Sequence, residues 1–203
     1  LDLISPQYVS DLVCWGAIGA RTAESQVHRE LTSGLSCPMG IKNSTKGDVQ
    51  IAIDAIKSAQ YQHVFLGTTK KGKVAIFKTS GNDDTHIILR GGLEPNYHPK
   101  DIENCRADLE KNEVNANIMV DFSHGNSQKN HENQKKVSAS ICDQIANGNK
   151  DIIGVMIESH LKEGNQKISE NMEYGKSITD ACVDWEETKK LLNDLAQAVK
   201  ARR

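Results

Sequence analysis

The sequence predicts an α/β fold of the barrel type, in which parallel strands alternate with helices. Short apolar runs, typical of strands buried on both faces, recur between segments with helical spacing of apolar residues. The clearest run, Ile118–Val120, becomes polar and reaches His124 just before a glycine. Four other runs also end at a charged residue, and a barrel presents the ends of its parallel strands on one face.

Composition narrows the class of protein. The 203 residues suit one domain over 1–203, and a formal net charge of −2 gives no electrostatic case for nucleic acid or an anionic membrane. The longest apolar runs fall far below the roughly 20 residues that span a bilayer. Five scattered cysteines without a Cys-x-x-Cys pair indicate reduced thiols in a cytoplasmic protein.

The first part of the chain alternates helical and strand patterns. Ser5 followed by Pro6 indicates a helix start, because proline is favoured at the first helical position. Apolar residues spaced three or four apart predict helices, and short apolar runs predict strands. The expected helices cover residues 5–13, 24–35 and 48–56, and the expected strands cover residues 16–20 and 38–41.

The second part departs once from this alternation. Runs at 64–67 and 74–77, joined by a Lys-rich turn with a glycine, predict a β-hairpin. A polar stretch over 162–176 is too long for an ordinary connection and is typical of a functional loop. The remaining strands are expected at 87–89, 117–124 and 152–157, and the remaining helices at 99–109, 137–145 and 184–201. We expect both tryptophans, Trp15 and Trp185, to lie in the core.

Charged residues at the five expected strand ends, together with Asp180 in a late loop, sort into two chemical groups. Arg21, Lys42 and Arg90 are cations, which suit a substrate carrying phosphate or phosphate and carboxylate. A nitrogen and two carboxylates form the second group, which suits Mn²⁺, Fe²⁺, Co²⁺ or Zn²⁺. The members of this second group are His124, Glu158 and Asp180. The alternative is that the cations and carboxylates pair as structural salt bridges, although buried charges are costly without a task.

Several long motifs in order along the chain resemble a known family. They lie at residues 16–22, 24–26, 28–30, 40–43, 88–92, 121–126 and 174–182. This pattern resembles the 3-deoxy-D-arabino-heptulosonate 7-phosphate (DAHP) synthases of the class found in enteric bacteria and yeast. The resemblance implies a (β/α)8 TIM barrel, of which this chain supplies roughly the last five strands plus an inserted hairpin. It also implies that the chain is a C-terminal portion, which by itself is expected to be inactive and poorly soluble.

The resemblance further implies a metal-dependent transferase that condenses phosphoenolpyruvate with erythrose 4-phosphate, the entry to the shikimate pathway. Arg21, Lys42 and Arg90 would hold phosphoenolpyruvate, and Lys42 would orient the substrate and move a proton. His124, Glu158 and Asp180 would bind the divalent ion. Two alternatives stay open: a sibling synthase that uses a longer sugar phosphate, and a non-catalytic remnant that binds phosphate or a partner subunit.

Regulation and assembly are also implied by the resemblance. Several family members are inhibited by an aromatic amino acid that binds near the positions of Pro6, Gln7 and Ser36. The alternative for these residues is a purely structural role as a helix start and a turn. A homodimer or homotetramer is expected.

Overall fold

The computed structural model describes residues 2–203, and its contacts divide the chain into two compact units that we describe in turn. The first unit runs up to Ile88 and includes Cys105–Asn117, and the second comprises Leu89–Asn104 and Ile118–Arg203. The prediction of a single domain over 1–203 stays a prediction. Across residues 2–203, no helix is both long enough and apolar enough to cross a membrane.

Three parallel strands form the centre of the first unit. They are β1 (Gly16–Ile18), β2 (Met39–Lys42) and β5 (Thr85–Leu89). Strand β2 lies between the other two, pairing Gly16 with Met39 on one side and Lys42 with Ile88 on the other. Every residue of β5 is buried, as expected of a parallel strand covered on both faces.

Helices flank these strands in the first unit. They are α1 (Pro6–Val9), the 3₁₀ turn η1 (Ser10–Leu12), α2 (Gln26–Thr32) and α3 (Gln50–Gln60). Helix α2 begins at Ser25, whose Oγ accepts the backbone N–H of His28. The predicted helix over 5–13 is wrong in length: α1 is a single turn, and Leu12 is 87% exposed.

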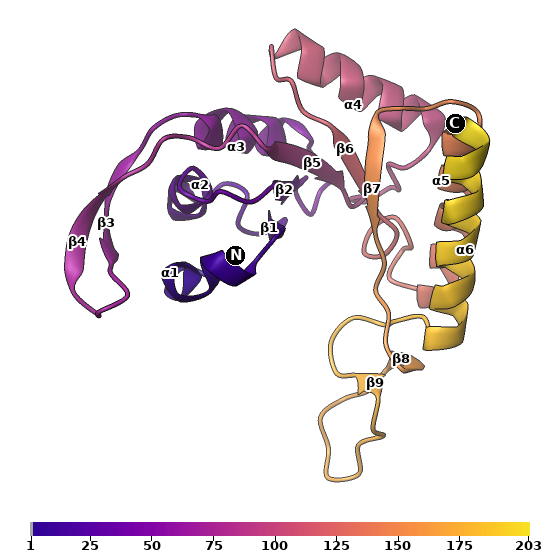
Figure 1. The fold of residues 1–203 in the computed structure, drawn as a ribbon. Helices are drawn as coiled ribbons and strands as arrows, with labels where there is room; N and C mark the ends of the chain where they lie inside the picture. Colours follow the sequence, from indigo (N-terminus) through magenta and orange to yellow (C-terminus); the bar gives the residue numbers. More distant parts are fainter. Residues whose placement is uncertain (1) are drawn as a thin grey trace. The chain divides into compact units, whose positions relative to one another are not determined.

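The predicted hairpin is confirmed and extends from the first unit as an arm (Figure 1). Its antiparallel strands are β3 (Val64–Thr68) and β4 (Val74–Lys78). On one face the rings of Phe65 and Phe77 stack with centroids 6.0 Å apart. Apolar side chains on the opposite face are exposed: Val64, Leu66, Val74 and Ile76.

The second unit contains the parallel pair β6 (Ile118–Asp121) and β7 (Ile152–Met156). After β6 come the 3₁₀ turn η2 (His131–Asn133) and α5 (Gln134–Ala146), and α5 packs alongside α6 (Trp185–Arg202) (Figure 1). The polar stretch carries the short paired strands β8 (Lys162–Asn165) and β9 (Lys176–Ser177). Helix α4 (Pro99–Lys111) begins in the second unit and ends in the first.

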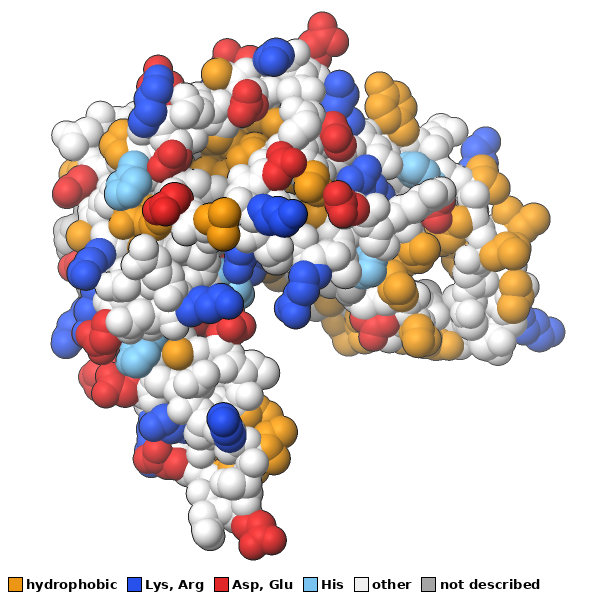
Figure 2. All heavy atoms as spheres, turned by 180° about the vertical axis from the view of Figure 1, so that it is seen from behind, with side chains coloured by type: hydrophobic (Ala, Val, Ile, Leu, Met, Phe, Trp, Pro, Cys, Tyr) orange, Lys and Arg blue, Asp and Glu red, His pale blue; other side chains and the backbone are white. Residues whose placement is uncertain are grey.

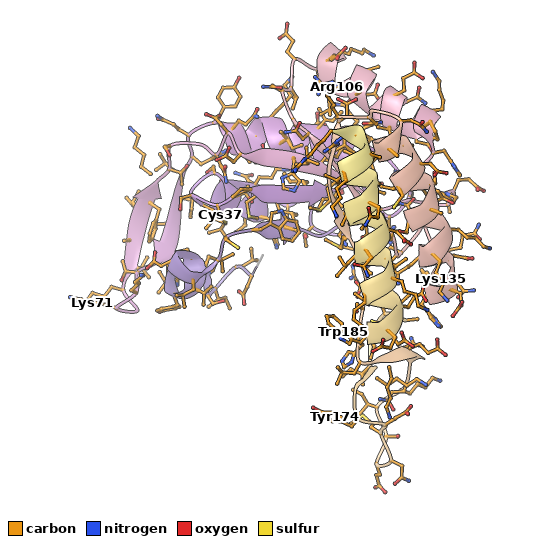
Figure 3. The ribbon with its side chains drawn as sticks, turned by 45° about the vertical axis from the view of Figure 1, so that its right-hand side comes forward. Cys37, Lys71, Arg106, Lys135, Tyr174 and Trp185 are labelled. Atoms are coloured by element: carbon orange, nitrogen blue, oxygen red, sulfur yellow. The ribbon has the colours of Figure 1, made fainter. Side chains whose placement is uncertain are left out.

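Two predictions about the core are wrong. Trp185 is 50% exposed, because it is the first residue of α6 after the cap Asp184 and lies off the buried face of that helix (Figure 3). Trp15 lies just before β1 and is also exposed, and its indole N–H donates to Nε2 of His86 at 3.1 Å.

The predicted strand over 117–124 ends earlier, at Asp121, because the chain then turns.

Candidate active site

The three predicted metal ligands lie together in the second unit. His124 Nε2 is 3.6 Å from Asp180 Oδ2 and 3.9 Å from Glu158 Oε1. One ligand atom from each residue lies within 4.8 Å of the others. They come from the turn after β6, the residues just beyond β7 and the segment after β9, so three separate segments supply one cluster. A nitrogen and two carboxylate oxygens at this spacing fit a divalent transition metal ion.

His124 is oriented by a carboxylate that sequence reasoning missed. Asp121, the last residue of β6, is fully buried, and its Oδ2 lies 2.8 Å from His124 Nδ1. A carboxylate oxygen in contact with Nδ1 favours the ring orientation that turns Nε2 toward Glu158 and Asp180. Asp121 and His124 are three residues apart around a turn, but no pattern in the sequence marks the left-handed residue that brings them together.

The turn that carries His124 has unusual backbone geometry. His124 has φ +54°, a left-handed conformation that is uncommon outside glycine and in which asparagine, aspartate and histidine are enriched. The carbonyl of His124 accepts the N–H of Lys129 at 2.8 Å, and Ser123 donates its N–H to the Asp121 carboxylate at 2.9 Å. These bonds hold the turn in place, so backbone strain is stored next to the candidate site.

Within the second unit, Arg90 and Gly91 lie against this turn. The carbonyl of Arg90 accepts the N–H groups of Gly125 at 3.0 Å and Asn126 at 3.2 Å. Gly91 has φ +75°, and a Cβ there would lie 2.4 Å from backbone atoms of both Gly125 and Asn126. Arg90 itself is buried. The predicted anion-binding arginine is therefore fixed to the turn that carries His124 by close backbone contact.

Arg21 and Lys42 lie in the first unit. Lys42 is the last residue of β2 and is half-buried, and Arg21 lies exposed in the turn after β1. Each follows the carboxyl end of a parallel strand, as predicted. The convergence of these two cations with Arg90 and the metal cluster stays a prediction.

Two of the three predicted effector residues line a cavity of about 950 Å³ in the first unit. Pro6 and Gln7 form part of its wall, together with α2 and the hairpin residues Phe65 and Phe77. Figure 2 shows hydrophobic side chains gathered around a hollow beside the hairpin. Ser36 is exposed and is not among the lining residues, although its neighbour Leu35 is.

The second unit contains another group of possible metal ligands, but its chemistry differs from that of the first cluster. His131 Nε2 lies 3.6 Å from Glu132 and 3.9 Å from Glu163. Lys135, near the start of α5 (Figure 3), pairs with Glu132 at 3.0 Å, and this hydrogen bond raises the pKa of the lysine. Because the Lys135 ammonium already pairs with Glu132, we interpret this group as an exposed ion-pair network and not as a metal site.

Cys182 lies beside the candidate site. Burial, together with repulsion from the Glu158 carboxylate, raises the pKa of its thiol, so the sulfur stays protonated near neutral pH. The S–H donates to the carbonyl of Asp180 at 3.4 Å. The thiol thus helps to hold the backbone that carries the Asp180 carboxylate.

Comparison with known proteins agrees with these observations. The chain is 60% identical to the Phe-sensitive phospho-2-dehydro-3-deoxyheptonate aldolase of Escherichia coli K12, over all of this chain and 59% of that protein. It is 56% identical to the tyrosine-inhibited phospho-2-dehydro-3-deoxyheptonate aldolase of Schizosaccharomyces pombe, over all of this chain and 56% of that protein. The chain therefore spans less than two thirds of the length of these relatives.

A solved structure gives the same result for the fold. The phospho-2-dehydro-3-deoxyheptonate aldolase from Francisella tularensis SCHU S4 matches with a TM-score of 0.96 and 56% identity, covering all of this chain and 60% of that one. The prediction that the chain supplies part of a TIM barrel, with five parallel strands and an inserted hairpin, is confirmed. Residues 1–193 match the DAHP synthetase I family, and the chain belongs to that family.

Proposed function

We propose that the protein carrying this chain is a DAHP synthase that condenses phosphoenolpyruvate with erythrose 4-phosphate to give DAHP and phosphate. The observation that carries the proposal is the cluster of His124, Glu158 and Asp180, with Asp121 behind the imidazole. It occurs in a chain 60% identical to an enzyme named for this activity. The donor set fits Mn²⁺, Fe²⁺, Co²⁺ or Zn²⁺.

Each group in the proposed site has a distinct task. Arg21 and Arg90 bind the phosphate of phosphoenolpyruvate through paired N–H groups, and Lys42 orients that substrate and moves a proton. The vinyl carbon of phosphoenolpyruvate attacks the aldehyde, water adds at C2, and phosphate leaves. A bound metal ion supplies Lewis acidity for the aldehyde oxygen. His124, Glu158 and Asp180 would hold that ion.

The sharpest test removes the imidazole without disturbing the turn. Asparagine tolerates the left-handed conformation that His124 adopts, so His124→Asn keeps the backbone while deleting the metal donor. In the full-length protein we expect loss of bound Co²⁺ and loss of phosphoenolpyruvate consumption. The matched control is His131→Asn in the exposed ion-pair network, which should keep both. Full turnover by His124→Asn would refute the proposed metal role.

We also propose that an aromatic amino acid binds the cavity of the first unit and inhibits the enzyme. Support comes from the apolar lining, including Phe65 and Phe77, and from relatives named as Phe-sensitive and tyrosine-inhibited. Phe, Tyr and Trp are each titrated into the full-length protein while rate and melting temperature are followed. Gln7→Ala should weaken the response, whereas Gln50→Ala on the exposed side of α3 should not. No response to any of the three would contradict the proposal.

A homodimer or homotetramer is the proposed assembly. The hairpin exposes four apolar side chains on one face, and association would remove them from water. These residues are Val64, Leu66, Val74 and Ile76. Light scattering on the full-length protein gives the mass directly, and a monomer at micromolar concentration would contradict this proposal.

A further inference from the structure

Gln134 is a polar residue in a core position. It is the first residue of α5, and its side chain is fully buried on the same face as Val137, Ser138 and Ile141. The spacing of three, four and seven residues places all four on one stripe of the helix. A buried amide on that stripe is costly unless both of its polar ends are hydrogen-bonded.

Both ends of this amide bond to the backbone of one residue, Glu158. The Gln134 Nε2 donates to the Glu158 carbonyl at 3.0 Å, and the Glu158 N–H donates to Gln134 Oε1 at 3.0 Å. The side chain therefore pairs with Glu158 as a neighbouring strand would. It does so just beyond Met156, where β7 ends.

A second contact completes the support around Glu158. The N–H of Val183 donates to the same Glu158 carbonyl at 3.0 Å. The backbone of Glu158 is thus held by α5 through Gln134 and by the segment that follows Asp180 through Val183. Its side chain is left to reach toward His124, where its carboxylate lies 3.9 Å from Nε2.

We propose that Gln134 is a positioning residue for the metal centre: its amide fixes the backbone of Glu158 so that the carboxylate meets His124 and Asp180. This inference rests on the proposed function, because it assumes that the cluster binds a metal ion. Partners of this kind behind metal ligands typically change affinity by about 10- to 100-fold when they are removed.

Only an amide meets the requirement at this position. The methionine side chain has similar length and flexibility but neither donates to a carbonyl nor accepts strongly from an N–H. An ionised glutamate would accept from the Glu158 N–H but would place a negative charge against the Glu158 carbonyl. Both Gln134→Met and Gln134→Glu should therefore release Glu158, for different reasons.

The matched control lies on the same helix. Gln144 is also buried, and its Nε2 donates to the Tyr97 carbonyl at 2.8 Å and to Ser140 Oγ at 3.4 Å, away from Glu158. Gln144→Met therefore removes a buried amide from the same unit without touching the cluster. Because Gln144 Oε1 has no hydrogen-bond partner among residues 2–203, this variant should lose less stability than Gln134→Met, and the comparison rests on Co²⁺ affinity.

The experiment titrates Co²⁺ into the full-length protein and its variants by calorimetry, with far-UV circular dichroism as the check on folding. Gln134→Met should bind Co²⁺ about 10- to 100-fold more weakly, and Gln144→Met should match the unmodified protein. The same change is then made in a Glu158→Gln background. If Gln134 acts through Glu158, its replacement should cost less than about 3-fold there, because coupled residues are not additive.

The possible outcomes distinguish failure of the positioning role from failure of the proposed function. Equal affinity for Gln134→Met and the unmodified protein, or the same loss with and without the Glu158 carboxylate, would overturn the positioning role. If Gln134→Met does not fold, Gln134→Glu carries the same comparison with less change in volume. An unmodified protein that binds no Co²⁺ would instead overturn the proposed function, and this inference with it.

Discussion

Replacing Gly91 by alanine should disrupt the second unit through a backbone clash. Gly91 has φ +75°, and a Cβ there would lie 2.4 Å from both Gly125 C and Asn126 N. Ordinary van der Waals contact is about 1 Å longer, so the turn after β6 must move away from residue 91. That movement lengthens the two hydrogen bonds that Gly125 and Asn126 donate to the Arg90 carbonyl.

The expected cost follows from these contacts. The left-handed conformation costs a non-glycine residue about 1–2 kcal/mol. Two weakened hydrogen bonds add about 1 kcal/mol each, which brings the loss in the free energy of unfolding to about 3–4 kcal/mol. Because the displaced turn carries His124, the affinity for Co²⁺ should fall as well.

Gly148→Ala, also in the second unit, is the control that introduces backbone strain without a clash. Gly148 has φ +98°, and a Cβ there would meet nothing within 4 Å, so this variant should lose only the conformational term. Urea unfolding of both variants, followed by circular dichroism, gives the comparison. If the two substitutions cost the same to within about 0.5 kcal/mol, the argument from backbone contact is wrong.

Three further predictions follow from single contacts. Asp121→Asn removes the charge behind His124 and should weaken Co²⁺ binding about 10- to 100-fold; unchanged affinity in a titration would contradict the orienting role. Burial lowers the pKa of His86, whose ring accepts the Trp15 N–H. As the pH falls, the unfolded chain therefore protonates His86 before the folded protein does. The free energy of unfolding should decrease below about pH 6.5, by at most about 1.4 kcal/mol per pH unit. Urea unfolding from pH 5 to 8 should show a flatter profile for His86→Gln, and parallel profiles would count against this reasoning. Asp184→Ala removes the α6 cap and should cost about 1 kcal/mol in thermal melts, with no loss if the cap is dispensable.

Sequence reasoning located the strand ends because the signal there is local. A buried parallel strand such as Ile118–Asp121 needs an unbroken apolar run, and the first polar residues after it mark its carboxyl end. His124 and Glu158 were found in this way. Asp180 follows a polar stretch without such a strand, and it was grouped with them because a nitrogen and two carboxylates form a typical metal-binding set.

Other features of the site depend on contacts that no local pattern encodes. The pairing of Asp121 with His124 requires a left-handed residue held by bonds from Lys129 and Ser123, so spacing alone did not reveal it. The burial of Gln134 is another such case, because a polar residue in a helix is normally predicted to face solvent. The prediction for Leu12 was wrong in the opposite direction: the apolar spacing around it predicted a buried helix face, yet its side chain is exposed.

All three candidate metal donors belong to the second unit, and this has a consequence for hydrogen exchange. A ligand that binds only the folded form of a region stabilises that region by about 2.7 kcal/mol at 100 times its dissociation constant. Amides of β6, β7 and the start of α6 should therefore exchange about 100-fold more slowly when Co²⁺ is present, where their exchange needs the donors to separate. Amides of α3, which belongs to the first unit, carry no such direct coupling. Bound metal would thus slow hydrogen exchange in the second unit more than in α3.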